Sequence, residues 1–248
     1  MPEGELSETA AETEAEAPEV LKVVESDLYR VTLSSRGGVI KKWELKKYTE
    51  KDKETGAEAP IQLVPEGIKV FPLALSLPGE IEKTYQLDSA ALQLSPASPE
   101  AVVVMVYAGP IGKKITKTFR FSHETYLVGL KLETQGYGQS YDLSLGTNFG
   151  IHEWGEQIGQ NAGGVSLIDN EVLRNIPSKM EESTVSYSGR AKWFALEDKY
   201  FISALIPKND SSIGPVIFEK KGEKAISAKV QLKSENDASL HDFSLYAG

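Results

Sequence analysis

The chain has 248 residues, of which 40% are hydrophobic and none is cysteine, and its net charge at pH 7 is -9. The length suits one large β domain or two small ones, and the lack of cysteine excludes disulfides, thiol catalysis and thiolate metal sites. No basic stripe indicates nucleic-acid binding, and no stretch approaches the ~20 apolar residues that a transmembrane helix needs.

The first 18 residues form an acidic segment that carries most of the net charge. It contains no Lys or Arg and has six glutamates: Glu3, Glu5, Glu8, Glu12, Glu14 and Glu16. Such a composition offers little apolar surface to offset the entropy of ordering. We therefore expect residues 1–18 to be a disordered acidic linker and residues 19–248 to form a single domain.

After this segment the apolar residues alternate with polar ones, which places one face of each strand on a core and the other in water. Lys117 interrupts the apolar face of its own segment. The alternating or continuously apolar segments are 29–33, 71–77, 101–108, 115–121, 126–132 and 226–232. About ten or more strands separated by turn residues predict an all-β fold, a large antiparallel β-sandwich with few short helices.

Glycine marks two features of this pattern. Gly37 and Gly38 lie between two predicted strands, where they favour a tight turn or bulge rather than a phosphate-binding loop. Residues 136–165 are rich in glycine, and we expect long loops there at the rim of the sandwich. A short helix is possible over 168–176.

The aromatic residues suggest both a core and a rim. Trp193, Phe194, Tyr200 and Phe201 are expected to fill the core, because aromatic side chains bury large areas. The rival interpretation is a sugar-stacking platform, which would need an exposed tryptophan. Trp154, within the glycine-rich stretch, is the candidate for a ligand-facing rim. Asp198 and Lys199 could form an ion pair or mark an active site, but a turn between two strands is the preferred interpretation.

The histidines do not suggest a metal or cofactor site. His123, His152 and His241 lack the spacing of zinc ligands. His152 precedes Glu153, and sugar epimerases on large sandwiches use a histidine with a carboxylate. Adjacent residues of a strand point to opposite faces, which opposes their use as a pair. We therefore expect no catalytic residue, no cofactor, no metal and no enzymatic activity.

Two aromatic-rich segments, 36–48 and 192–207, resemble parts of the large periplasmic domain of the bacterial YidC-type membrane protein insertases. The first carries the family's Gly-Gly turn and Leu-x-x-Tyr element, and the second its Trp, Tyr-Phe and Pro. The chain ends on a Tyr-x-Gly sequence that resembles the junction leading into the family's membrane core. The matching residues are Gly37, Gly38, Leu45, Tyr48, Trp193, Tyr200, Phe201, Pro207, Tyr246 and Gly248.

The resemblance implies a β-supersandwich of the galactose mutarotase type. It also implies a non-catalytic interaction domain at the periplasmic face of the bacterial inner membrane, within a protein that inserts and folds membrane proteins, alone or with the Sec translocon. The implied partners are Sec accessory subunits and nascent membrane proteins, with a chaperone-like contact among the possible roles. The transmembrane segments that perform insertion would lie outside this chain. The alternative is a carbohydrate-binding or mutarotase-like sandwich protein.

Overall fold

The computed structural model describes most of the chain after the acidic segment. The predicted linker therefore lies, apart from Pro18, outside the described residues, and so do Glu153 and Trp154. No helix in the described part of the chain is long and apolar enough to cross a membrane. The described ranges are 18–51, 56–77, 83–110, 112–138, 140–152, 162–208, 213–234 and 237–248.

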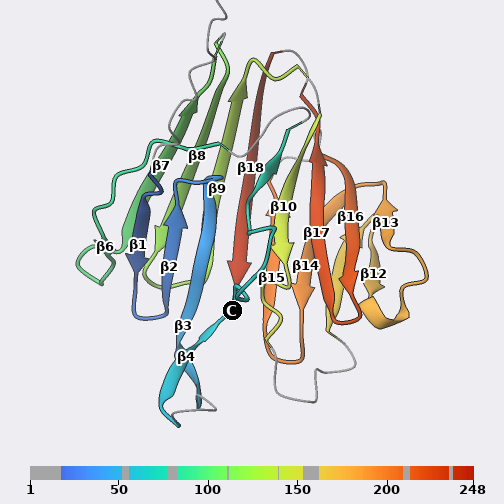
Figure 1. Ribbon diagram of the computed structural model, residues 1–248, viewed down its shortest axis with the longest axis horizontal. Coiled ribbons are helices and arrows are strands. Elements are labelled where there is room, and N and C mark those ends of the chain that lie inside the picture. Colours follow the sequence, from blue (N-terminus) through green and yellow to red (C-terminus); the bar gives the residue numbers. More distant parts are fainter. Residues whose placement is uncertain are drawn as a thin grey trace, which may run out of the picture.

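A long sheet of eight strands forms the back layer of the molecule (Figure 1). All of its neighbouring strands are antiparallel, as the alternating pattern predicts. In spatial order the strands are β12 (Glu171–Asn175), β11 (Gly163–Ile168), β14 (Ala191–Glu197), β15 (Ile202–Pro207), β18 (Ala238–Ala247), β9 (Leu127–Gln135), β8 (Lys114–Ser122) and β7 (Glu100–Ala108).

Two five-stranded sheets lie in front of this layer (Figure 1). The first consists of β4 (Glu58–Gln62), β3 (Val39–Lys51), β2 (Tyr29–Ser34), β1 (Leu21–Glu25) and β6 (Leu92–Gln93). The second consists of β13 (Thr184–Tyr187), β16 (Ile213–Gly222), β17 (Ala225–Leu232), β10 (Tyr141–Thr147) and β5 (Leu75–Ser76). The predicted antiparallel β-sandwich is thus confirmed.

The core lies between the layers and is one continuous cluster of buried side chains that draws on all three sheets. On one side, the Tyr29 hydroxyl donates to the Ser122 carbonyl oxygen at 2.8 Å and joins β2 to the end of β8. Trp43 of β3 is fully buried and packs edge-on against Phe149, with ring centroids 6.0 Å apart. The first contact fixes the first front sheet on the back layer, and the second joins it to the segment that follows β10 of the second front sheet.

Two predictions for residues 136–176 are wrong. Residues 168–176 form no α-helix but the β11–β12 hairpin, whose turn residues Asp169 and Asn170 have φ of 48° and 68°. Asp and Asn tolerate this left-handed region and suit a two-residue hairpin turn. The glycine-rich stretch 136–165 is not all loop either, because β10 and the start of β11 lie in it. The only helix in the described residues is a 3₁₀ turn, Pro177–Lys179.

The aromatic prediction is half right. Phe194 and Phe201 are buried in the main core. Trp193, next to Phe194 on β14, faces the opposite side of the back sheet and is only partly buried, in a small cluster with Val165 and Ala195. Tyr200 lies in the turn after β14 and is exposed, so it does not fill the core. Trp193 is not in the main core because adjacent residues of a strand point to opposite faces, and Tyr200 is exposed because it lies in a turn.

Candidate functional site

A pocket of about 480 Å³ opens beside β5, on the face of the second front sheet that points away from the main core. We call it the β5 pocket. Its apolar wall includes Phe71, Leu75 and Tyr85, and its polar side includes residues of β10, β16 and β17. Its volume is in the range of ligand sites in proteins. Because β5 is an edge strand of its sheet, the pocket lies along a sheet edge.

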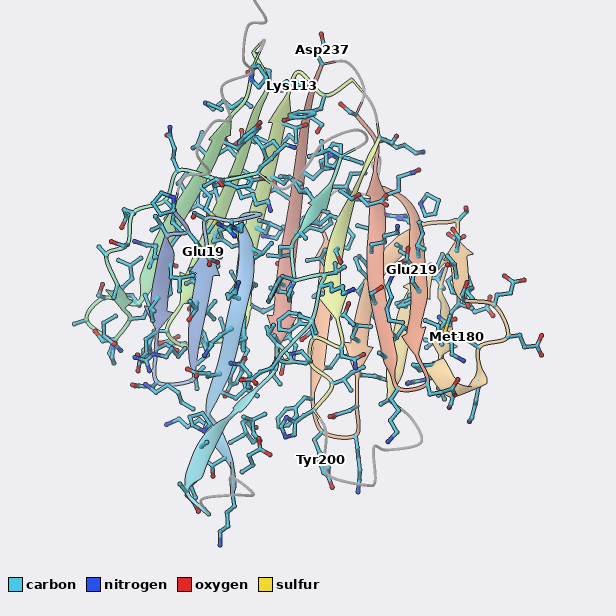
Figure 2. The ribbon with its side chains drawn as sticks, in the orientation of Figure 1. Glu19, Lys113, Met180, Tyr200, Glu219 and Asp237 are labelled. Carbon is cyan, nitrogen blue, oxygen red and sulfur yellow. The ribbon has the colours of Figure 1, made fainter. Side chains whose placement is uncertain are left out.

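Three charged residues of β10, β16 and β17 form an ion-pair network on the polar side of the pocket. Lys229 Nζ lies 3.0 Å from Asp142 Oδ2 and 2.9 Å from Glu219 Oε1. Burial works against the charge of Lys229, but the hydrogen bonds to both carboxylates outweigh it and raise the pKa of the ammonium group. Burial likewise opposes the charge of Glu219, yet hydrogen bonds from Lys221 and Lys229 lower the pKa of its carboxyl. Figure 2 shows Glu219 on the front sheet.

The opposite wall depends on the Gly37-Gly38 turn between β2 and β3. The Gly37 N–H donates to the Lys83 carbonyl oxygen at 2.7 Å. Both glycines have positive φ, 72° and 59°, and a Cβ on Gly38 would lie 2.9 Å from the Tyr85 ring. Glycine is therefore needed for both the backbone conformation and the close approach of Tyr85, which lines the pocket. The tight turn predicted here is present.

Lys117 of β8 lies fully buried behind this turn. Its Nζ donates to the carbonyl oxygens of Gly38 at 2.8 Å, Leu73 at 2.7 Å and Gly37 at 3.2 Å. Burial lowers the pKa of the Lys117 amine to about 7. One side chain thus connects the two backbone segments that pass beneath the pocket wall.

The three histidines lie in other parts of the molecule. His152 Nε2 is 2.9 Å from Glu50 Oε2, and its backbone N–H donates to Asp198 Oδ2 at 2.9 Å. His123 Nε2 lies 3.1 Å from Asp27 Oδ2. His241 is buried within β18, which lowers the pKa of its imidazole to about 4. Within the described ranges, no group of His, Asp and Glu is arranged to hold a metal ion.

The residues that carry the sequence resemblance to the insertase domain are only partly brought together. Some of them meet at one end of the molecule and others do not. Tyr48 and Phe201 form an edge-to-face pair with centroids 5.5 Å apart, and Tyr246 lies beside Gly248. The predicted turn after β14 is formed by Asp198, whose Oδ1 accepts the N–H groups of Tyr200 and Phe201. The remaining residues of this set are dispersed. Gly37 and Gly38 lie at the β5 pocket, and Leu45 lies in the core. Trp193 lies on the outer face of the back sheet, and Pro207 lies at the end of β15.

No motif in the sequence indicates Asp142, Glu219 or Lys229 as site residues. A signal for Lys229 was present, because Lys229 lies on the polar face of the strand predicted over 226–232. The partner strands that place the two carboxylates beside it are far away in the sequence, so the network itself was not visible there.

A protein-family model described as the YidC periplasmic domain matches residues 22–248. A membrane protein insertase YidC of Chlorobium phaeovibrioides is 29% identical over 91% of this chain and 41% of its own length. The corresponding protein of Syntrophus aciditrophicus is 28% identical over 76% of this chain and 36% of its own. The chain therefore spans less than half the length of these relatives.

Solved structures show the same fold at low sequence identity. A galactose mutarotase related enzyme from Lactobacillus acidophilus has a TM-score of 0.57 at 8% identity and covers 92% of this chain and 97% of its own. A protein from Synechocystis has a TM-score of 0.54 at 9% identity, covering 94% of this chain and 96% of its own. These likenesses establish the sandwich fold.

Proposed function

The chain belongs to the family of YidC periplasmic domains, and from this premise we propose that it is a non-catalytic periplasmic interaction domain of a membrane protein insertase. Its β5 pocket would receive an extended segment of a nascent membrane protein. The whole relatives are named membrane protein insertases. In this proposal the membrane-embedded part of the protein follows Gly248 and performs the insertion, while the sandwich contacts the segment outside the bilayer.

The position of β5 at the edge of its sheet carries the proposal. β5 pairs with β10 on one side, through Leu75 opposite Leu143 and Ser76 opposite Asp142. An extended peptide can add to an edge strand by main-chain hydrogen bonds, and side-chain pockets then provide selectivity. Phe71 and Leu75 would accept apolar side chains, whereas the Lys229 network would contact a polar or charged residue.

Chemistry of the mutarotase type would need an acid and a base on opposite sides of a sugar ring. The histidines are engaged elsewhere, His152 near Glu50 and His123 near Asp27, and the pocket's carboxylates, Asp142 and Glu219, are paired with Lys229. This arrangement supports a binding function over an enzymatic one.

The partners in this proposal are nascent membrane proteins and, by family resemblance, accessory subunits of the Sec translocon. The compartment is the periplasmic face of the inner membrane, in agreement with the description of the matching family.

Photo-crosslinking tests the pocket. A benzoylphenylalanine replaces Leu75 in the pocket, and in a matched control it replaces exposed Val172 on β12. The probe is a synthetic peptide containing one transmembrane segment of an inner-membrane protein with its polar flank. We expect a crosslink from position 75 and none from position 172. Equal labelling at the two positions would contradict the proposal, as would a saturable tryptophan-fluorescence response to a panel of sugars.

A further inference from the structure

An aromatic surface surrounds the C-terminal glycine. Figure 1 shows the C-terminus at the same end of the molecule as the β3–β4 hairpin and the β14–β15 turn. A Cβ on Gly248 would lie 3.2 Å from both the Tyr126 ring and the Tyr246 hydroxyl. We call this surface the tyrosine end and define it by these residues around Gly248: Tyr48, Tyr126, Tyr200, Phe201 and Tyr246. None of them lines the β5 pocket.

Four of these rings form one connected group although four different segments supply them, and Tyr200 precedes Phe201 in the chain. Tyr126 and Tyr246 pack edge-on with centroids 6.4 Å apart, and Tyr48 packs on Phe201. Burial, together with the neighbouring phenols of Tyr48 and Tyr246, raises the pKa of Tyr126. The tyrosine end is therefore built on a packed group of four rings, with Tyr200 next to Phe201 at its margin.

Part of the patch faces solvent. Tyr200 is 58% exposed and Tyr48 is 48% exposed, and Leu127, opposite Tyr246 in the β9–β18 register, is 41% exposed. The backbone that presents Tyr200 is fixed, because Asp198 Oδ1 accepts the backbone N–H of Tyr200 at 2.6 Å and that of Phe201 at 2.8 Å. Apolar groups held outward in this way mark an interaction surface.

Cations accompany the exposed rings. Lys199 Nζ lies 4.9 Å from the centre of the Tyr200 ring, and exposed Lys47 precedes Tyr48 in the chain. Tyrosine, with an apolar ring and a polar tip, is enriched where a membrane protein meets the lipid headgroups. Lysine can rest its methylene stem on apolar surface while its ammonium group contacts phosphate.

We propose that the tyrosine end docks on the lipid headgroup region of the bilayer, with Tyr48 and Tyr200 as its anchors. This inference rests on the proposed function, in which the membrane part of the protein follows Gly248. A domain joined to the bilayer at the centre of the patch meets the lipid surface at a high effective concentration, so a few weak anchors suffice to orient it. The β5 pocket is then presented to segments at the membrane surface.

The lack of native cysteine allows a labelling test. A single cysteine replaces Lys47, which keeps both anchors, and carries an environment-sensitive nitrobenzoxadiazole label. The control label replaces Asp237, which Figure 2 shows at the opposite end from Tyr200. The chain carries a C-terminal hexahistidine tag, and the vesicles consist of phosphatidylethanolamine, phosphatidylglycerol and a nickel-chelating lipid. Binding of the tag to this lipid tethers the C-terminus to the vesicle and takes the place of the proposed membrane connection.

On tethering, we expect the label at position 47 to gain about twofold in emission with a blue shift, as for a group entering the interface, and the label at position 237 to stay unchanged. Tyr48→Ser together with Tyr200→Ser should abolish the response at position 47. Leu240→Ser, at a residue of similar exposure (49%), should leave it intact. Because both tyrosines are exposed, the double variant should keep the unfolding midpoint of the parent.

Three results would overturn docking. The first is an unchanged label at position 47, and the second is a response that survives the double variant. The third is a response without vesicles that grows with protein concentration, since a second copy of the chain would then cover the patch. The crosslinking test of the β5 pocket uses no vesicles, so failure of the proposed peptide binding and failure of membrane docking are separately visible.

Discussion

Lys117 Nζ and the Gly38 carbonyl oxygen lie 2.8 Å apart, and through this contact the back sheet fixes the turn that shapes the β5 pocket. The lysine is fully buried and also holds Leu73, whose backbone has a φ of 67°. Two unusual turns, at Gly38 and Leu73, thus depend on one side chain.

The first prediction is that stability rises above neutral pH because of Lys117. Its pKa is about 7 in the folded chain and 10.5 as an unperturbed amine. Between these values the unfolded chain holds a proton that the folded chain has released, so the free energy of unfolding gains up to about 1.4 kcal/mol per pH unit. Urea denaturation between pH 7.5 and 9 should show this slope. Lys117→Met should lack it, while Lys199→Met, at an exposed lysine, should keep it.

The second prediction separates the two roles of glycine at the pocket wall. Gly38→Ala should lower the free energy of unfolding by about 3 kcal/mol, because it adds a contact with the Tyr85 ring to the cost of a positive φ. Gly67 has a similar φ of 71° with open space around it, so Gly67→Ala should cost only about 1 kcal/mol. Chemical denaturation measures both. Equal losses would mean that Tyr85 moves aside without cost.

Lys117 also shows how far the sequence could predict this fold. The alternation of apolar and polar residues was sufficient to predict the strands β8, β9 and β17, because each of them has one face on the core. The same pattern over 71–77 predicted a full strand, but only Leu75–Ser76 pair in a sheet. There the left-handed Leu73 gives its carbonyl oxygen to Lys117 and its N–H to the Ser144 carbonyl oxygen. Such contacts between distant segments override a local pattern, and they also build the β5 pocket.

A third prediction follows from the two sides of the back sheet. The sequence predicted that Trp193 fills the core, but Trp193 is only partly buried on the outer face. We expect a loss of about 1–2 kcal/mol there, against about 3–5 kcal/mol for Trp43→Ala in the main core. Urea midpoints compare the two variants. A larger loss at Trp193 would show that the outer cluster contributes more than its burial suggests.

The fourth prediction concerns acid. His241 has a pKa of about 4 in the folded chain because burial disfavours its charge, against 6.5 when unperturbed. As the pH falls from 6.5 to 4, the unfolded chain gains a proton that the folded chain does not, so stability is lost by up to about 1.4 kcal/mol per pH unit. His241→Leu should have a shallower slope than the parent in denaturation series across this range. Parallel slopes would mean that other groups account for the acid sensitivity.

The last prediction is that residues 1–18 do not contribute to the stability of the sandwich, whereas Glu19 does. Deleting residues 1–18 should leave the melting temperature within about two degrees, since the segment offers little apolar surface to bury. Glu19 is different, because its Oε1 accepts from Ser34 Oγ at 2.5 Å and lies 3.3 Å from Lys41 Nζ. The hydrogen bond from Ser34, aided by Lys41, lowers the pKa of the Glu19 carboxyl. Removing Glu19 as well should therefore cost about 1 kcal/mol. A large loss from the shorter deletion alone would show that the acidic segment packs on the sandwich.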